Sequence, residues 1–570
     1  MTALLTDNLP LLAGASNGIK KLRELILELA VRGKLVPQDA SDEPASELLK
    51  RIAEEKARLG KLKKQKPLAQ IDEDEAPFDL PNSWQWGRLG DLSELITSGS
   101  RDWAQHYSDE GAIFVRMGNL SRRSYALRLG SIQRVSPPKD GEGSRTKLEP
   151  DDLLLSITGE VGLLGLIPEE FGEAYINQHV CLIRFVRSIR GRFLPEALRS
   201  PLAYEQYEAP QRGIKNSFRL SDVSKILVPL PPLAEQHRIV AKVDELMALC
   251  DRLETQQADA ESAHARLVQA LLDSLTQTSD AADFAANWQR LAKHFHTLFT
   301  TEASIDALKQ SLLQLAVMGK LVPQNSSDEP ASDLLKRIAE KKARLVAEGE
   351  IKKQKPLLEI AQEDAPFEKP CGWSWVRLEA LTKVITKGSS PKWQGISYTD
   401  NPNDVLFITS ENVGSYKLRL ESKKYVEREF NTIEPRSILH KGDFLMNIVG
   451  ASIGRTAIFD IDMEANINQA VCLIRSFSEF LSDQFFLHFF NSEICLSYMF
   501  DKQVDNARAN LSMGNIANFV LPIPPLAEQH RIVAKIDQLM NLCDELKPRL
   551  TQARRLNEQL TSSLVKQAVA

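Results

Sequence analysis

Residues of the types that bind nucleic acid gather in two stretches of the first half of the chain. Residues 111–147 hold eight Lys and Arg against two acids, and residues 211–220 hold three with no acid. Arg can bond guanine through two hydrogen bonds and Asn can bond adenine, whereas Lys more often meets phosphate. We therefore predict that DNA is contacted by Arg116, Arg122, Arg123, Arg128, Arg145, Lys147, Arg212, Lys215, Asn216, Ser217 and Arg219.

The second half carries a looser version of the same pattern. Its basic residues between 417 and 428 are diluted by Glu421 and Glu427, and a further polar group lies near residue 506. The candidates for DNA contact there are Lys417, Lys423, Lys424, Lys502, Asn506, Arg508 and Asn510. Three aromatic residues, Tyr125, Tyr416 and Trp393, could pack on sugars or bases. For any single residue of these groups, the alternative is an ordinary solvated surface charge.

Patterns that bind phosphate or transfer a methyl group are missing. The Gly-Lys pairs at residues 33, 60 and 319 are followed by Leu, whereas a phosphate-binding loop needs Ser or Thr there. The paired glycines in residues 159–162 and 450–454 are typical of β-turns. The chain also lacks the Asn/Asp-Pro-Pro-aromatic motif of an adenine methyltransferase.

Metal and nuclease chemistry is equally poorly supported. Asp404, Glu421 and Lys423 could form a minimal nuclease site, but the first half has no counterpart. His294 and His296 have no Cys or carboxylate cluster around them to complete a metal site. We predict no catalytic residue, no metal site and no cofactor bound by this chain.

The composition is that of an ordinary globular protein. The 570 residues are 43% hydrophobic and carry a net charge of −5, so any DNA binding must come from local basic patches. No apolar run approaches the roughly 18 residues of a membrane span, and no basic segment precedes an apolar N-terminal stretch. The six Cys form no Cys-x-x-Cys pair, which favours free thiols in a reducing, cytoplasmic compartment.

An internal repeat organises the chain. Residues 33–59 recur as residues 319–345 with four differences in 27 positions, and residues 231–253 recur as 524–546 with four differences in 23. Between these blocks only landmarks agree, such as Ile176–Arg184 and Ile467–Arg475. A period near 290 residues is too long for a solenoid and indicates two whole modules related by pseudo-twofold symmetry.

Each module is expected to begin with helices and to continue as mixed α/β structure. Leu22, Leu25, Ile26 and Leu29 have helical spacing ahead of Gly33, and Ser41 or Asp42 could cap the next helix. Short β-rich runs at 112–116, 153–157, 405–408 and 444–448 predict strands, and residues 483–490 predict a helix.

A long helix follows each mixed region. Apolar residues recur in alternating steps of four and three from Ile239 to Leu271 and from Ile532 to Leu564, which predicts a coiled coil whose seam includes Leu267 and Leu560. We expect the two helices to pair antiparallel. The residues predicted to form the seam or to dock other subunits are Leu233, Ile239, Leu246, Leu253, His264, Leu526, Ile532, Leu539, Leu546 and Asn557.

The arrangement resembles the specificity subunits of type I restriction-modification systems. The resemblance rests on the two Pro-Pro-Leu-Ala-Glu-Gln-His-Arg-Ile-Val blocks, 231–240 and 524–533, and on the polar stretches 213–222 and 507–515 that precede them. Ala507 stands where the first copy has Gly213. The resemblance implies a prokaryotic cytoplasmic protein that binds double-stranded DNA, two methyltransferase subunits and restriction/translocase subunits. It also implies that the partner subunits bind S-adenosylmethionine, ATP and Mg²⁺.

The predicted fold is therefore two α/β, strand-rich target-recognition domains joined by long antiparallel coiled-coil helices. The expected boundaries are 1–65 and 279–350 for the helical regions, 66–230 and 351–523 for the recognition domains, and 231–278 and 524–570 for the long helices. Two other classes stay open: a self-sufficient nuclease or methyltransferase, and a coiled-coil scaffold that binds no DNA.

Overall fold

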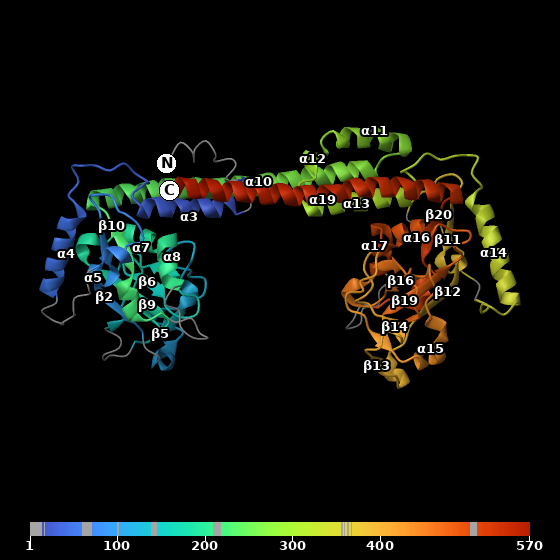
Figure 1. Ribbon diagram of the computed structural model, residues 1–570, viewed down its shortest axis with the longest axis horizontal. Coiled ribbons are helices and arrows are strands. Elements are labelled where there is room, and N and C mark those ends of the chain that lie inside the picture. Colours follow the sequence, from blue (N-terminus) through green and yellow to red (C-terminus); the bar gives the residue numbers. More distant parts are fainter. Residues whose placement is uncertain are drawn as a thin grey trace. The chain divides into compact units, whose positions relative to one another are not determined.

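The chain folds into two compact units. The computed structural model describes residues 14–15, 17–59, 71–99, 102–137, 145–208, 218–354, 357, 359–361, 364–365, 367–501 and 510–569. Unit 1 comprises Met1–Ala260 and Ala553–Ala570, and unit 2 comprises Glu261–Gln552. Each unit contains one sheet-bearing domain with its own hydrophobic core (Figure 1).

Helices precede the sheet domain of each unit, as the sequence predicts. In unit 1, α3 (Gly18–Val31) buries Leu22, Leu25, Ile26 and Leu29, and Gly33 follows it with a φ of 68°. Helices commonly end at a residue in the left-handed backbone conformation, and glycine adopts that conformation without strain. The remaining helices of these regions are α4 (Ala45–Leu59), α13 (Glu302–Val317) and α14 (Ala331–Ala347), with α11 (Ala281–Ala292) and α12 (Phe295–Leu298) ahead of α13.

The predicted cap of α4 is wrong. The helix begins at Ala45, after Pro44, so neither Ser41 nor Asp42 is at its N-cap position. The Ser41 hydroxyl donates to Asp39, and the Asp42 carboxylate accepts a 2.6 Å hydrogen bond from Arg238 of the long helix. The equivalent Asp328 of unit 2 is bonded in the same way to Arg531, also at 2.6 Å. The repeated Asp therefore ties each pair of short helices to a long helix.

Sheet domain 1 (residues 85–230) consists of three small sheets. A two-stranded sheet of β1 (Gln85–Arg88) and β10 (Leu227–Leu230) closes the domain. The first four-stranded sheet has the order β2-β9-β6-β7: β2 (Ser93–Ser98), β9 (Val180–Phe185), β6 (Leu153–Ser156) and β7 (Leu164–Leu166). The second has the order β3-β5-β4-β8: β3 (Tyr107–Ser108), β5 (Gln133–Val135), β4 (Ala112–Val115) and β8 (Ala174–Ile176).

The first of these sheets forms the centre of the domain core. Strand β6 is buried along its whole length and β9 is buried except at Arg184, which explains why they are nearly continuous apolar runs. Helices α7 (Phe193–Leu198) and α8 (Pro201–Glu208) contribute buried residues to the same core, and α9 (Leu220–Lys225) leads into β10. In Figure 1 the second sheet, marked by β5, lies at the end of the domain away from α7 and α8.

Sheet domain 2 (residues 374–523) repeats this topology strand for strand. Its sheets are β11-β20, β12-β19-β16-β17 and β13-β15-β14-β18, and the β14-β18 pair is parallel like β4-β8. The strands are β11 (Ser374–Arg377), β12 (Thr382–Lys387), β13 (Tyr398–Thr399), β14 (Val405–Ile408), β15 (Tyr425–Val426), β16 (Phe444–Asn447), β17 (Thr456–Ile458), β18 (Ala465–Ile467), β19 (Val471–Ser476) and β20 (Val520–Ile523). The two stretches that share almost no sequence, 100–148 and 389–439, therefore form equivalent strands.

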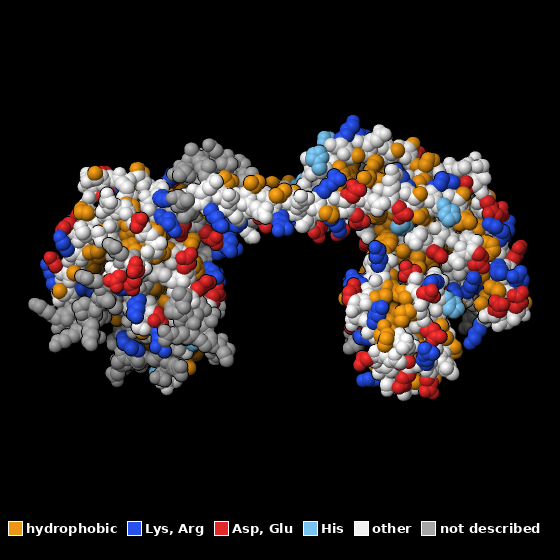
Figure 2. Space-filling model, in the orientation of Figure 1, with side chains coloured by type: hydrophobic (Ala, Val, Ile, Leu, Met, Phe, Trp, Pro, Cys, Tyr) orange, Lys and Arg blue, Asp and Glu red, His pale blue; other side chains and the backbone are white. Residues whose placement is uncertain are grey.

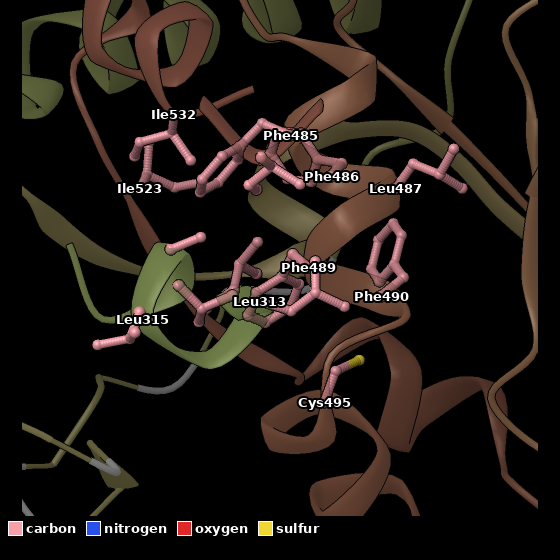
Figure 3. Packing of buried hydrophobic residues seen from close by; sticks show 14 of the residues in the cluster. Leu313, Leu315, Phe485, Phe486, Leu487, Phe489, Phe490, Cys495, Ile523 and Ile532 are labelled. Atoms are coloured by element: carbon pink, nitrogen blue, oxygen red, sulfur yellow. The ribbon is translucent and has the colours of Figure 1, made fainter. Parts of the chain in front are cut away.

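Phenylalanine side chains fill much of the core of unit 2. Helix α16 (Asp483–Phe490), predicted from the sequence, contributes Phe485, Phe486, Phe489 and Phe490. Figure 3 shows these rings beside side chains of α13, of α17 (Glu493–Asp501), of β20 and of the long helix α19 (Leu526–Val569). The core thus joins the sheet domain of unit 2 to its helices.

Both predicted long helices are present, and each contributes residues to both units. Helix α10 (Leu233–Thr276) begins in unit 1 and ends in unit 2, whereas α19 (Leu526–Val569) begins in unit 2 and ends in unit 1. Within unit 1, Ile239 shares a core with Ala568, and within unit 2, Ile532 shares a core with Leu272. Each unit therefore combines the start of one long helix with the end of the other, which is the predicted antiparallel arrangement.

The predicted seam is wrong toward the ends of both long helices. Leu267 and Leu560 are 52% and 54% exposed, and Leu271 is 37% exposed, whereas Val268, Leu272 and Thr561 are buried. A straight helix drifts about 20° per heptad relative to a strict seven-residue repeat. After several heptads the neighbouring positions have turned inward, and the leucines predicted for the seam have turned outward.

His264 also has a different role from the predicted register-setting seam residue. Its Nε2 lies 2.9 Å from the carbonyl oxygen of Leu298, at the end of α12. The polar ring therefore ties α10 to a short helix of unit 2.

Candidate nucleic-acid interface

Three connections of sheet domain 1 come together at one edge, which we call loop edge 1. They are residues 116–132 between β4 and β5, residues 157–163 between β6 and β7, and residues 177–179 between β8 and β9. Arg122 of the first lies 3.6 Å from Glu160 of the second, and the amide of Ile157 donates to the carbonyl of His179 at 3.0 Å. Loop edge 1 therefore gathers basic and polar side chains from distant parts of the sequence.

A buried asparagine shapes the first of these loops. Asn119 accepts a 2.9 Å hydrogen bond from the amide of Arg116 and donates to the carbonyls of Arg128 and Ser131 at 2.9 and 3.0 Å. Because one side chain bonds both ends of the loop, the loop has a fixed shape without regular structure.

Sheet domain 2 repeats this arrangement with Asn412. It accepts from the amide of Thr409 at 3.0 Å and donates to the carbonyls of Arg419 and Ser422 at 3.0 and 3.2 Å. Neither asparagine was predicted from the sequence to have this role. The signal that could have found them is an Asn four residues after the end of each matched strand.

A tyrosine in the first loop connects it to the long helix. Tyr125 donates to Glu196 at 3.0 Å and accepts a 2.6 Å bond from Arg192, which also donates to Asp244 of α10 at 2.7 Å. Burial raises the pKa of Tyr125 to about 12, so its hydroxyl stays protonated at neutral pH.

The equivalent chain in unit 2 runs through a histidine. Tyr416, which has a φ of 69°, lies 3.3 Å from His488 Nδ1, and His488 Nε2 lies 3.6 Å from Asp537 of α19. Both tyrosines are thus held inside their units, which corrects the expectation that their rings face nucleic acid. Trp393, the third aromatic candidate, is 75% exposed.

Some basic candidates of sheet domain 1 lie on the first loop of loop edge 1, and others lie at its start or beside β8. Arg122, Arg123 and Arg128 are exposed on the first loop, where the Arg122 guanidinium also lies 4.9 Å from the ring centre of Tyr204. Arg116 is half-buried at the loop's start, and exposed Lys147 lies beside β8 through a 3.7 Å ion pair with Glu173. Figure 2 shows Lys and Arg side chains at the end of the domain that carries the second sheet.

The other candidates are distributed as follows. Arg145 and Arg219 are exposed in unit 1, and Lys417, Lys423 and Asn510 are exposed in unit 2. Lys424 forms a 2.8 Å ion pair with Glu411. Seven candidates lie outside the described residues: Arg212, Lys215, Asn216, Ser217, Lys502, Asn506 and Arg508.

The backbone brings the flanks of both undescribed candidate stretches to equivalent places. The amide of Phe218 donates to the carbonyl of Ile157 at 2.8 Å, and the amide of Leu511 donates to the carbonyl of Ile448 at 2.9 Å. Phe218 and Leu511 therefore contact the turns that join β6 to β7 and β16 to β17, and Arg219 and Asn510 are their neighbours in the chain. This places Arg219 next to loop edge 1.

Each central sheet is braced by a buried ion pair. Asp152 and Asp443 are both 1% exposed, and each accepts two hydrogen bonds of 2.7–2.8 Å from one arginine, Arg184 or Arg475. Asp152 and Asp443 also accept from the backbone amides of Glu149 and His440. A bidentate Arg–Asp pair of this kind fixes the orientation of the two side chains as well as the distance between them. These pairs therefore hold in place the strands that lead into the loops.

His488 makes the stability of unit 2 depend on pH. Burial lowers its pKa to about 4, against about 6.5 in an unfolded chain, and nearby Asp537 only partly opposes this shift. Below pH 6.5 the unfolded chain takes up a proton that the folded chain does not, so stability falls as the pH falls. Between pH 7 and pH 5, we expect the free energy of unfolding to fall by about 2 kcal/mol more in the wild type than in H488Q. Urea unfolding at the two pH values measures this difference. Equal losses in both proteins would contradict this.

No metal centre is evident in the described parts of the chain, which hold no group of three or more His, Cys, Asp or Glu side chains arranged around an ion. The described helices likewise include none that is both long and apolar enough to cross a membrane. The six cysteines are free, and Cys181, Cys250, Cys472 and Cys543 are buried as predicted.

Comparison with known proteins identifies the family. The model of the type I restriction modification DNA specificity domain matches residues 81–261 and 370–553. The chain is 36% identical to the type I restriction enzyme EcoAI specificity subunit of Escherichia coli, over 97% of this chain and 94% of that protein. It is 37% identical to the EcoEI specificity subunit of Escherichia coli with the same coverage. The chain therefore belongs to the family of type I restriction-modification DNA specificity proteins.

Solved structures include similar chains. A chain from a study of complex assembly and conformational transition in the type I R-M system is 19% identical, with a TM-score of 0.49, over 86% of this chain and 99% of that one. The HsdS subunit from Thermoanaerobacter tengcongensis is 19% identical, with a TM-score of 0.41, over 87% and 98%. The family assignment rests on the sequence matches.

Proposed function

We propose that this chain reads a two-part, asymmetric DNA sequence for a type I restriction-modification complex and catalyses no step itself. Sheet domain 1 reads one part and sheet domain 2 reads the other. The observation that carries this proposal is that both domains have the same strand order and the same Asn-held loop, while the loop side chains differ. A shared frame with unlike loops is suited to reading two different base sequences.

The mechanism follows from the chemistry of the loops. Exposed Arg and Lys anchor phosphates, and Arg, Asn and Gln side chains bond base edges in the major groove. Because α10 and α19 each contribute to both units, their length sets the unread spacer.

Exchange of one sheet domain tests this function. Replacing residues 84–230 with the same region of a relative that has another target should change one half of the recognised sequence and leave the other half and the spacer unchanged. Methylome sequencing of cells that carry the exchanged protein and its partners measures both halves at once. A change in both halves would contradict separate reading. Binding without sequence preference would indicate a scaffold, and methyl transfer by the purified chain would indicate an enzyme.

We further propose that two methyltransferase subunits dock on exposed leucines of the long helices, and that restriction subunits join them. Leu267 of α10 and Leu560 of α19 occupy equivalent positions of the repeat and are more than half exposed, with Leu271 and Leu556 one turn away. Exposed apolar side chains at such positions mark interaction sites, and one equivalent exposed leucine on each long helix, Leu267 and Leu560, suits two copies of one partner. Figure 2 shows hydrophobic side chains along the visible surface of the long helices.

The seam residues predicted from the sequence have another role in this arrangement. Ile239, Leu246, Ile532 and Leu539 are buried within their own units, so they stabilise the helices and are not exposed for docking. Leu233, Leu253, Leu526, Leu546 and Asn557 are partly buried. The partner subunits, and not this chain, would hold S-adenosylmethionine, ATP and Mg²⁺.

A further inference from the structure

The short loop between the eighth and ninth strands of sheet domain 1 has the same backbone turn as its counterpart in sheet domain 2. Asn177 accepts from the amide of His179 at 3.1 Å, and Asn468 accepts from the amide of Ala470 at 3.0 Å. The carbonyls of His179 and Ala470 each accept a 3.0 Å bond from the facing turn. Residues 176–184 and 467–475 differ only at this one position. Since alanine supports the same turn, folding of the loop does not require a histidine.

A glycine in each domain lets the preceding strand's end approach this loop closely. A Cβ on Gly99 would lie 2.1 Å from the carbonyl oxygen of Ile176, and one on Gly388 would lie 1.8 Å from that of Ile467. The amide of Gly99 also donates to the carbonyl of Asn177 at 3.2 Å. The side chains that follow Asn177 therefore project from a fixed backbone, which lowers the entropic cost of binding through them.

The exposed His179 ring holds two neighbouring polar groups. Its Nδ1 lies 2.6 Å from the Thr158 hydroxyl, and its Nε2 lies 3.0 Å from the Gln178 amide nitrogen. If Nδ1–H donates to Thr158, Nε2 accepts from Gln178 and fixes the direction of that amide. The Gln178 Oε1 and its second N–H then remain to bond a ligand. In sheet domain 2 the corresponding positions are Val449 and Ala470, so the histidine and its hydroxyl partner are replaced together.

The location of this group suits nucleic acid. Thr158 and His179 belong to loop edge 1, whose neighbouring turn carries Glu160 in an ion pair with Arg122. The chain that leads to Arg219 joins the same turn through the bond between Phe218 and Ile157. Basic side chains that can meet phosphates therefore lie on the same loop edge as a neutral amide that can meet a base.

We propose that Gln178, held in place by His179 and Thr158, is a base-reading residue of sheet domain 1, and that its partner on DNA is adenine. The amide offers one acceptor and one donor, which complement adenine N6 and N7 in the major groove. Sheet domain 2 keeps Gln469 but lacks the histidine and threonine that would fix it, so the two domains read differently at this position. This inference rests on the proposed function.

Selection from a random duplex library tests the proposal. The full-length chain, assembled with its partner subunits, selects binding sequences from the library, which are then compared between wild type and Q178A. Q178A should lose preference for adenine at one position in one half of the sequence, by about 5- to 150-fold, and leave the other half unchanged. H179A should weaken the same preference at the same position, and it should fold because Ala470 supports the same turn. Gln105, an exposed glutamine on the 3₁₀ turn Asp102–His106 of the same domain, provides the control Q105A, which should select the wild-type sequences.

The outcomes separate this inference from the function on which it rests. If the wild type selects no sequence at all, the proposed function fails. If the wild type selects a two-part sequence and Q178A selects the same one, Gln178 does not read a base. A uniform weakening at every position would likewise overturn the proposal, because it would indicate a phosphate contact or a folding defect.

Discussion

Replacing Asp443 with alanine should cost unit 2 about 3–5 kcal/mol of stability. The substitution leaves Arg475 without its carboxylate partner at a side chain only 23% exposed, and it removes the bond to the amide of His440. An uncompensated, partly buried charge is one of the most destabilising single changes in a protein. Urea unfolding of the full chain, followed by tryptophan fluorescence, measures the loss.

Two variants give this prediction its controls. D152A removes the equivalent carboxylate from sheet domain 1, but Arg184 keeps Glu149 as a partner at 2.8 Å, so unit 1 should lose less stability than unit 2 loses in D443A. D462A removes a carboxylate that is 96% exposed and pairs with Lys441 at 3.4 Å, and it should change stability by less than about 1 kcal/mol. If D443A and D462A unfolded alike, the buried pair would not brace the sheet.

Replacing both Leu267 and Leu560 with glutamate should abolish docking of the partner subunits. Each change puts a charge into a surface that becomes apolar and dry on binding. Hot-spot residues at the centre of an interface contribute about 2 kcal/mol or more of binding free energy, which is equivalent to about 30-fold in affinity. Both leucines are more than half exposed in this chain, so the variants should fold normally. The mass of the assembled complex measures how many partner copies remain.

The repeat supplies the internal control for docking. L267E alone and L560E alone should each remove one partner copy and leave the other. Q269E introduces the same charge on the opposite side of α10 and should leave assembly intact. If L267E,L560E still bound two partner copies, the leucines would not form the docking surfaces.

The helical parts and the main strands could be predicted from sequence because their signals are local. Helical spacing ahead of Gly33 predicted α3, and apolar runs predicted β4, β6, β14 and β16 within one residue of their ends. The duplicated blocks also predicted that α10 and α19 would be equivalent. The exact seam could not be predicted, because a small angular drift per turn accumulates along the helix and moves Leu267 and Leu560 to the surface.

The residues of the candidate site also divide into those that a linear sequence reveals and those that only tertiary contacts reveal. Charge counting predicted Arg122, Arg123 and Arg128 as candidates, since clustered basic residues are visible in a linear sequence, and the structure places all three exposed on one loop. It could not find Asn119 or Asn412, whose importance lies in bonds across their own loops, nor could it show that Tyr125 and Tyr416 face inward. Burial and hydrogen-bond partners depend on the packing of other segments, which composition does not encode.

Sequence alone determined that this chain contains one frame twice, with long helices and two unlike middle regions, because repeats and hydrophobic periodicity are written along the chain. Only the tertiary structure showed that the unlike regions share one strand order. It alone also brought Thr158 beside His179, since these residues meet only when β6 and β9 pair in the sheet. Hydrogen bonds between strands determine which loops become neighbours, and that information is absent from any single segment.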